Sequence, residues 1–296
     1  MAPHSSFSDT ECNRRDQSDP FDRLDAVGLW DSFNYLEEFD MSNRIAIVTG
    51  ASRGIGRATA IRLAKDFGGV VLVARSTDLL EQTAEAVRSA GAEPLSLGAD
   101  LRTPAAAKEA VDKTLEKFGR IDAVVNIAGA VPQVDVLDMT DEQWDDGFAL
   151  KLHGARRLAI HAWESLRKSE GSVIFTSGNS AQAPKSPFAA VATVNAAIVA
   201  MAKAFADRGV KDGVQVNSVL PGPVMTNRRR TYMEKYAPAH GMTVEEALEK
   251  FPAEAGITRY GNPEDIAELM AFVLSPAGRW IVGSALRMDG GEIKGV

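Results

Sequence analysis

Short apolar segments alternate with longer amphipathic ones from residue 43 onward. The stretches "RIAIVTG", "VVLVAR", "DAVVNIAG", "SVIFTSG" and "VQVNSVLPG" are continuous runs rich in Val and Ile. Such runs are typical of parallel strands that are buried on both faces. The segments between them, among them 54–68, 76–91 and 104–118, have the apolar spacing of helices. Strands joined by helical crossovers predict an α/β fold with a doubly wound parallel sheet.

The second half of the chain continues this alternation and then interrupts it once. Helices are predicted over about 141–168 and 187–209, and the connection 222–262 is the one long segment between elements. A long connection beyond the carboxyl edge of a doubly wound sheet often closes over a ligand crevice. We therefore expect a single dinucleotide-binding domain over 41–296, with a C-terminal lid at about 222–262.

The first 40 residues differ from the rest in charge. They contain ten Asp/Glu and three Arg, so this segment holds the whole net charge of −7 and the remainder is neutral. We expect 1–40 to be a mostly disordered acidic arm. Five apolar residues between 24 and 36 have the spacing of a short amphipathic helix. The arm is either a solvated tail or a docking segment for a neighbouring subunit or partner.

Composition limits the classes of function. The chain is 45% hydrophobic and 25% charged, as in ordinary globular proteins, and we find no apolar run of the ~18–20 residues that a membrane helix needs. A neutral body with an acidic arm disfavours nucleic acid as a partner. The single cysteine, Cys12, permits no intrachain disulfide and fits a reducing, cytoplasmic location. The four histidines have no metal-ligand spacing, so we expect no metal centre.

A glycine-rich turn joins the first predicted strand to the first predicted helix. "VTGASRGIGRA" places Gly50, Gly54 and Gly56 at this junction. Glycines permit a tight turn and a close approach of the backbone to a ligand, and a helix N-terminus offers free N–H groups to a pyrophosphate. In this strand–turn–helix context the motif predicts a dinucleotide site.

Two arginines favour NADP(H) over NAD(H). An NAD site usually has an acidic residue at the end of the second strand, where it binds the ribose 2′-hydroxyl. Arg75 stands there in this chain, and Arg53 lies in the glycine-rich turn. Guanidinium groups bind a 2′-phosphate through charge-assisted hydrogen bonds. Either arginine is alternatively a solvated surface residue.

Five motifs in this order resemble the short-chain dehydrogenase/reductase family. They are "TGASRGIG", "GADL", "NIAG", "VNSVLPGPVMT" and "SALRMDGG", and they extend over nearly all of 43–291. The resemblance implies a Rossmann-type fold, a nicotinamide cofactor and assembly into homodimers or homotetramers through two long helices. It also implies a cofactor-binding set that comprises Gly50, Ser52, Arg53, Gly54, Ile55, Gly56, Arg75, Asp100, Asn126, Pro221, Gly222 and Thr226.

Within that set the resemblance assigns particular contacts. Asp100 would contact the adenine, Asn126 would line the cofactor ribose, and 221–226 would cover the nicotinamide end. Asn126 is a partial match, because the family commonly has a second Asn where Ile127 stands.

The family's catalytic positions hold other residues in this chain. Members of the family use an Asn, a Ser, a Tyr and a Lys, with Tyr as the general acid. Counting back from "VQVNSVLPG" places Val191 at the Tyr position and Asn195 at the Lys position. The Ser position falls at Gly178 and the Asn position at Lys151. The chain therefore resembles a divergent member with a degenerate active site.

Three residues are candidates for the missing chemistry. Ser177 would polarise a carbonyl or merely cap local backbone, and the amide of Asn179 would serve as an oxyanion donor. Lys151 and Asn195 would exchange places across one small pocket, since the two helices pack side by side in this fold. A lysine with a lowered pKa in a closed pocket can do acid–base chemistry. Alternatively, Lys151 points to solvent.

The predicted lid offers weaker candidates. Tyr232 and Tyr236 would close over the substrate or form an apolar cover. The run "RRR" at 228–230 would bind an anionic substrate or is a solvated charged run.

The sequence thus favours an NADP(H)-dependent oxidoreductase with a non-standard active site. Its substrate would be a small organic carbonyl, alcohol, enone or imine. Positioning of substrate and cofactor alone can supply ~7–11 kcal/mol of the barrier reduction, so loss of one acid does not abolish catalysis. Two alternatives stay open: a catalytically inactive nucleotide-binding scaffold or partner subunit, and a cofactor-templated isomerase or cyclase.

Overall fold

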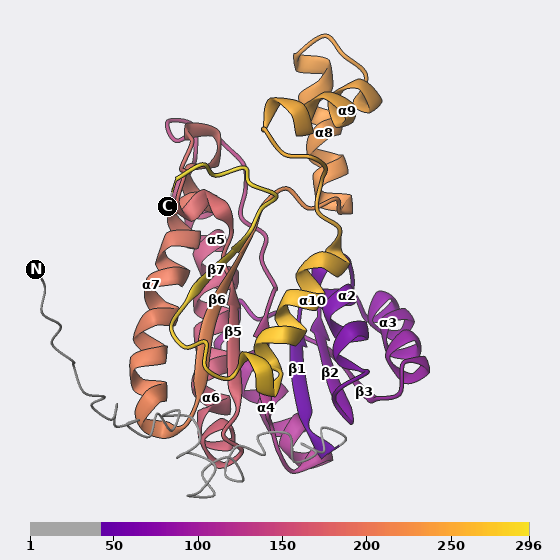
Figure 1. Cartoon of the computed structure of the whole chain (residues 1–296), viewed down its shortest axis with the longest axis vertical. Helices are drawn as coiled ribbons and strands as arrows, with labels where there is room; N and C mark the ends of the chain where they lie inside the picture. Colours follow the sequence, from indigo (N-terminus) through magenta and orange to yellow (C-terminus); the bar gives the residue numbers. More distant parts are fainter. Residues whose placement is uncertain (1–42, 296) are drawn as a thin grey trace, which may run out of the picture. The chain divides into compact units, whose positions relative to one another are not determined.

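A seven-stranded parallel sheet forms the centre of the protein (Figure 1). The computed structural model describes residues 43–295, so the predicted acidic arm at 1–40 lies outside the described residues. The strand order is β3-β2-β1-β4-β5-β6-β7, and each neighbouring pair is parallel. The predicted doubly wound α/β fold is confirmed.

The elements follow the predicted alternation. The strands are β1 Ile45–Thr49, β2 Gly69–Ala74, β3 Glu93–Gly98, β4 Ala123–Asn126, β5 Ser172–Thr176, β6 Gln215–Pro221 and β7 Ala285–Met288. The α-helices are α2 Gly54–Leu63, α3 Thr77–Ser89, α4 Pro104–Phe118, α5 Asp141–Phe148, α6 Ala155–Lys168, α7 Ala189–Asp212, α8 Asn227–Ala239, α9 Val244–Glu254 and α10 Pro263–Leu274.

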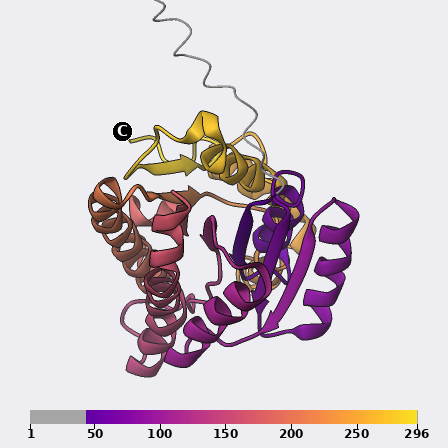
Figure 2. The same ribbon diagram turned by 90° about the horizontal axis from the view of Figure 1, so that it is seen from below.

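Alternation along the central strands divides the core between the two faces of the sheet. In β1, Ile45 and Ile47 belong to the apolar cluster with α4, α6 and α7, whereas Ala46 and Val48 belong to the cluster with α2, α3 and α10. The view in Figure 2 separates these layers, with α10 (yellow) and α4 (magenta) on opposite sides of the sheet. Burial on both faces explains why these strands are continuously apolar.

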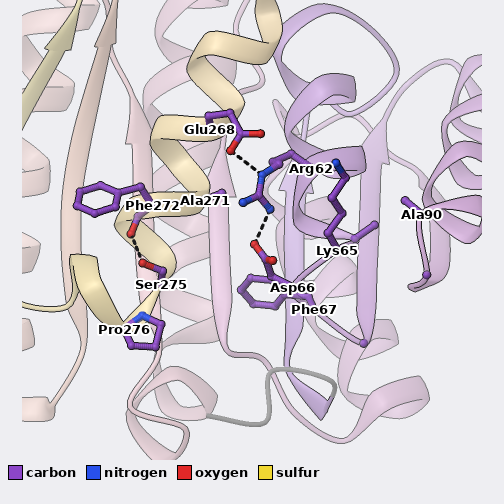
Figure 3. Close-up of a pocket in the computed structure, with 13 residues that line it drawn as sticks. Arg62, Lys65, Asp66, Phe67, Ala90, Glu268, Ala271, Phe272, Ser275 and Pro276 are labelled. Carbon is purple, nitrogen blue, oxygen red and sulfur yellow. Dashed lines mark hydrogen bonds and ion pairs between the residues drawn. The ribbon is translucent and has the colours of Figure 1, made fainter. Parts of the chain in front are cut away.

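Helix α10 is tied to α2 by a charged cluster. The guanidinium of Arg62 lies 2.7 Å from Glu268 on α10 and 2.6 Å from Asp66 just after α2 (Figure 3). These residues line a cleft of about 750 Å³ near the amino ends of the strands, away from the glycine-rich turn. The ion pairs help to hold α10 against the helix that follows the turn.

The predicted single helix over 141–168 is interrupted. A π-helical segment, Ala149–Gly154, separates α5 from α6. A π-helical turn accommodates an extra residue and is frequent at functional sites. This segment contains Lys151, so it determines the direction in which that side chain points.

The expectation that no segment is apolar enough to span a membrane was wrong for helix α7. The stretch Ser186–Asp212 passes that test by length and composition alone. Its buried residues, including Val194, Ile198 and Ala202, lie in the core cluster on one face of the sheet. One side of the helix packs against β5 and β6, and 33% of the apolar window is buried.

The connection predicted as a lid contains two helices, α8 and α9. They have a small apolar core of their own, formed by Met233, Ala237 and Ala247. An isolated bridge between Val224 and Gly261 joins the two ends of this lid segment, residues 222–262. Figure 1 shows α8 and α9 beyond the end of the sheet at which the glycine-rich turn lies.

Candidate active site

The glycine-rich turn requires glycine at two points. Gly50 has a φ of +67°, and a Cβ there would lie 3.1 Å from the backbone nitrogen of Ala128. A Cβ on Gly56 would lie 2.1 Å from the carbonyl oxygen of Gly50. The turn can therefore pack this tightly against β4 and α2 only without side chains.

The N-terminus of α2 opens into a cleft of about 1130 Å³. The N-cap residue Arg53 makes no side-chain cap, and the first turn contains no acidic residue, so its N–H groups are available to an anion. Nine of the twelve predicted cofactor-binding residues line this cleft: Gly50, Ser52, Arg53, Gly54, Ile55, Gly56, Arg75, Asp100 and Thr226. This arrangement fits the pyrophosphate and ribose of a dinucleotide.

Asp100 lies in an ion-pair network that the sequence did not predict. Its carboxylate lies 2.7 Å from the guanidinium of Arg102, which also lies 2.6 Å from Asp146 on α5. The hydrogen bonds from Arg102 lower the pKa of Asp100, and the positive charge of Arg75 contributes. Asp100 is therefore a fixed negative charge at the cleft wall.

The other three predicted cofactor residues are not in the cleft wall. Asn126 is buried at the end of β4, and its amide oxygen and nitrogen have no hydrogen-bond partner among residues 43–295. A buried amide without a partner is unfavourable unless a ligand or water satisfies it. Pro221 pairs with Met288 at the end of β6, and Gly222 packs against Asp289.

Lys151 reaches from the π-helical segment to α7. Its ammonium nitrogen donates to Oδ1 of Asn195 at 2.5 Å and to the backbone oxygen of Ser177 at 3.0 Å. Its side chain lies against Gly129, a wall residue of the cleft, where a Cβ would be 3.0 Å from Cδ of the lysine. The structure therefore brings Lys151 and Asn195 into contact, as predicted, and the Lys151 ammonium points to α7 and not to solvent.

The surroundings of Lys151 disfavour its charged form. Burial, and to a smaller extent the positive charge of Arg228, lower the pKa of Lys151 to about 7. An amine with this pKa holds its proton on about half of the molecules at neutral pH. Such a group can both donate and accept a proton near physiological pH.

The polar groups of Ser177 and Asn179 already have partners. The Ser177 hydroxyl donates to the backbone oxygen of Asn195 at 2.8 Å. The amide nitrogen of Asn179 donates to Glu292 in the C-terminal segment. In this arrangement both side chains hold the loop after β5 in place, and the Ser177 hydroxyl needs to release Asn195 before it can donate to a substrate.

The lack of a side chain at Gly178 leaves room for the amide of Asn195. A Cβ at position 178 would lie 2.6 Å from Nδ2 of Asn195, which donates to Ser180 at 2.9 Å. The absence of a side chain at 178 thus allows the amide to lie between Ser180 and Lys151. The sequence signal was Gly178 itself, at the position where the resemblance predicts a Ser, but its neighbour Asn195 was visible only in the fold.

Arg228 is not a free member of a solvated run. Its guanidinium donates to the backbone oxygens of Gly129 at 3.2 Å and Val131 at 2.8 Å. It thereby joins the first turn of α8 to the loop after β4, on the same wall that Lys151 contacts. Tyr232 contacts Phe188 with ring centroids 5.8 Å apart, which joins the lid segment to the start of α7.

Comparison with known proteins assigns the chain to a family. A family model described as enoyl-(acyl carrier protein) reductase matches residues 50–292. The chain belongs to the short-chain dehydrogenase/reductase family. Short-chain reductase protein NovJ from Streptomyces niveus is 31% identical over 248 residues, which cover 84% of this chain and 93% of NovJ. Versicolorin reductase stcU from Emericella nidulans is 31% identical over 262 residues, or 87% and 98% of the two chains.

Solved structures of other short-chain dehydrogenases/reductases have the same fold. L-Sorbose reductase from Gluconobacter frateurii, complexed with NADPH and L-sorbose, is similar with a TM-score of 0.82 and 30% identity. The match covers 87% of this chain and 100% of that one. A point variant of actinorhodin polyketide ketoreductase with NADPH has a TM-score of 0.80 and 28% identity, over 84% and 97% of the chains.

Proposed function

We propose that this short-chain dehydrogenase/reductase is an NADP(H)-dependent reductase of a small organic carbonyl, enone or imine, with Lys151 as its proton donor. The family's tyrosine position holds Val191, which packs beside the apolar core cluster and has no proton to donate. Lys151 is an ionisable side chain that contacts Asn195, four residues after Val191, and lies against Gly129 in the wall of a cleft suited to a dinucleotide.

The hydrogen bonds of Lys151 are the observation that supports this role. An ammonium group has three N–H donors. Two of them are used by Asn195 and the backbone oxygen of Ser177. The third position is an N–H in the ammonium form and a lone pair in the amine form. Both forms keep the two fixed contacts, so the group can exchange one proton without losing its position.

The positions of two arginines support NADP(H) as the cofactor. Arg53 and Arg75 are exposed side chains in the cleft wall, at the glycine-rich turn and directly after β2. The relatives named above include reductases whose structures contain NADPH. When bound, the reduced cofactor supplies a hydride.

Lys151 would complete the reduction by protonation. Its ammonium N–H would donate to the oxygen or nitrogen that becomes negative as hydride arrives. Asn195 would orient the lysine through its amide oxygen, and Arg228 would keep the pKa of Lys151 low enough for ready proton loss. An enone or imine needs less help from an acid than a simple ketone, so the proposal includes these classes.

Anaerobic incubation with NADPH and a panel of ketones, enones and imines tests this function. For the best substrate, Lys151→Met is expected to lower kcat by ~10²–10⁴, which is typical for loss of a general acid. The matched control is Lys65→Met, because Lys65 is an exposed lysine of the remote cleft (Figure 3). Equal activity of the two variants, with normal NADPH binding, would exclude Lys151 as the donor. Absence of turnover across the panel would contradict the reductase itself.

We further propose that the protein is a homodimer that associates through α6 and α7. An apolar groove of about 490 Å³ lies between these helices and is lined by Ile160, Trp163, Ala204, Phe205 and Arg208. Ile160 is 46% exposed despite its apolar side chain. Apolar surface on two adjacent helices favours association with a second copy.

A further inference from the structure

Arg229 lies among three aromatic rings of the lid segment. It is in the first turn of α8, and its guanidinium carbon is 4.9 Å from the ring centroid of Phe251. The rings of Tyr232 and Tyr260 are 5.6 Å and 5.9 Å away. Phe251 and Tyr260 stack with their centroids 5.5 Å apart. We call these three rings and Arg229 the arginine cage.

The hydrogen-bonding groups of this guanidinium have no partner within residues 43–295. No side-chain hydrogen bond or ion pair joins Arg229 to that part of the chain, whereas its neighbour Arg228 binds two backbone oxygens. Aromatic faces attract the positive charge, but they do not accept the hydrogen bonds that the N–H groups would otherwise donate to water. None of the Arg229 nitrogens is among the fully buried polar atoms without a partner, so these donors are accessible to water or to a ligand.

A second polar group in the cage is also without a partner. The hydroxyl of Tyr260 is buried and forms no hydrogen bond among the described residues. Burial lowers the pKa of Arg229, and Tyr260, Glu292 and Tyr232 counteract only part of this effect. Both observations indicate that a ligand acceptor belongs near these two side chains.

The cage adjoins the candidate active site. Met225 to Arg228, which immediately precede Arg229, line the cofactor cleft. Tyr232 of the cage contacts Phe188, which lies directly before α7 and three residues before Val191. The side chains of the cage do not themselves line the cofactor cleft, so a substrate would have to extend beyond that cleft to reach both Lys151 and Arg229.

We propose that Arg229 is a specificity-determining residue that binds a carboxylate on the substrate, remote from the group that is reduced. The inference rests on the proposed reductase function and narrows its substrate class to aromatic or conjugated oxo acids. A planar carboxylate matches the donor geometry of guanidinium, and the Tyr260 hydroxyl can donate to the same group. The rings of Phe188 and Tyr232 suit a flat apolar body.

The local charge favours a carboxylate over a phosphate. Glu292 is the acidic group that acts electrostatically on Arg229, and it accepts from Asn179. A ligand with one negative charge is repelled by Glu292 less than a ligand with two.

Benzoylpropionate and its neutral methyl ester are suitable probes. They share an aryl ketone and differ in the charge at the far end. Reduction with NADPH would be compared for the wild-type enzyme, Arg229→Gln, Arg229→Lys and the matched control Arg230→Gln. Arg230 is the adjacent exposed arginine of the same run. Calorimetric titration of the acid into the complex with NADP⁺ measures binding without turnover.

We expect wild-type kcat/KM to be about 10–100-fold higher for the acid than for the ester. Arg229→Gln should remove this preference and weaken binding of the acid about tenfold or more, with the ester and NADP⁺ unaffected. Arg229→Lys should be intermediate, because it keeps the charge and loses the planar fork. Arg230→Gln should resemble the wild type.

Two results would overturn the inference. One is equal reduction of acid and ester by the wild type. The other is an equal decrease in kcat/KM for the acid and the ester in Arg229→Gln, which is expected if the cage only stabilises the fold. If neither ketone is reduced, the proposed reductase function fails for them, and the calorimetry alone decides whether Arg229 binds the carboxylate. If Arg229→Gln does not fold, Arg229→Lys provides the comparison.

Discussion

The ammonium nitrogen of Lys151 lies 2.5 Å from the amide oxygen of Asn195. This contact joins the π-helical segment to α7. An amide oxygen accepts from either an ammonium or an amine, so the contact survives titration of the lysine. Lys151 and Asn195 thus form a pair in which one residue can change protonation and the other keeps it in position.

The pH dependence of reduction should report the titration of Lys151. The ammonium form is the acid, and burial together with the charge of Arg228 lowers its pKa to about 7. We expect kcat for reduction to be level below that pH and to fall about tenfold per pH unit above it. Arg228→Gln removes one positive charge and should move the fall to higher pH. A profile that is flat from pH 6 to 9 would contradict the assignment.

Substitution of Gly178 by Ser should disturb the pair. A Cβ there would lie 2.6 Å from Nδ2 of Asn195, which is the flexible end of that side chain. We expect the amide to move away from Lys151, with about 1–3 kcal/mol lost from the free energy of unfolding and at least tenfold lower kcat. Urea denaturation and steady-state kinetics measure the two effects.

A double-mutant cycle provides the control for this substitution. Gly178→Ser should be much less harmful to stability in an Asn195→Ala background, where the colliding amide is absent. Additive effects of the two substitutions would show that the predicted collision does not occur.

Arg75→Ala should weaken binding of NADPH about tenfold and leave binding of NADH nearly unchanged. Arg75 lines the cleft directly after β2, where a 2′-phosphate is expected, and NADH lacks that phosphate. Fluorescence titration of both cofactors measures the difference. Arg88→Ala, at an exposed position late in α3, is the matched control. Equal losses for the two cofactors would place the phosphate elsewhere.

The stability of the protein should rise with pH above neutrality because of Lys151. Its pKa falls from 10.5 to about 7 on folding, so between these values the native state binds fewer protons than the unfolded state. The free energy of unfolding therefore increases with pH in this window, by up to about 1.4 kcal/mol per unit from this one group. Below pH 7 Lys151 is protonated in both the native and the unfolded state, so its contribution to the free energy of unfolding no longer changes with pH.

Lys151→Met should remove that pH dependence. The difference in free energy of unfolding between wild type and variant, measured by urea denaturation from pH 7 to 9, should change steadily in favour of the wild type. A constant difference over this range would show that Lys151 titrates normally.

Ile160→Glu should dissociate the proposed homodimer. The substitution places a charge in the apolar groove between α6 and α7, where it would be desolvated on association. Analytical ultracentrifugation should show a monomer for the variant and a dimer for the wild type. Val210→Glu, an exposed position near the end of α7 and outside the groove, is the control. A monomeric wild type would refute the proposal.

The fold could be predicted from the sequence because its signals are local. The apolar runs of β1 and β2 reflect burial on both faces, and the glycine-rich turn lies at a strand–helix junction that fixes its role. The pairing of Lys151 with Asn195 was also predicted, since the packing of two helices follows from the fold. The contact of 2.5 Å confirms their proximity, while their role in catalysis stays a prediction.

Other features depend on the direction in which each side chain points, which cannot be read from the sequence. The run at 228–230 is uniform in charge, yet Arg228 binds the loop after β4 and Arg229 lies among aromatic rings. The space that Gly178 leaves is used by a residue 17 positions later. The π-helical segment was missed because one extra residue in a helix hardly changes an apolar period.

That extra residue makes the segment Ala149–Gly154 sensitive to length more than to composition. Successive residues of an α-helix are rotated by about 100°, so a one-residue deletion there would put α5 and α6 out of phase by that angle. Either helix could then keep its own packing only if the other turned its apolar side to water. Insertions and deletions at this joint should therefore be tolerated far less than exchanges of its side chains.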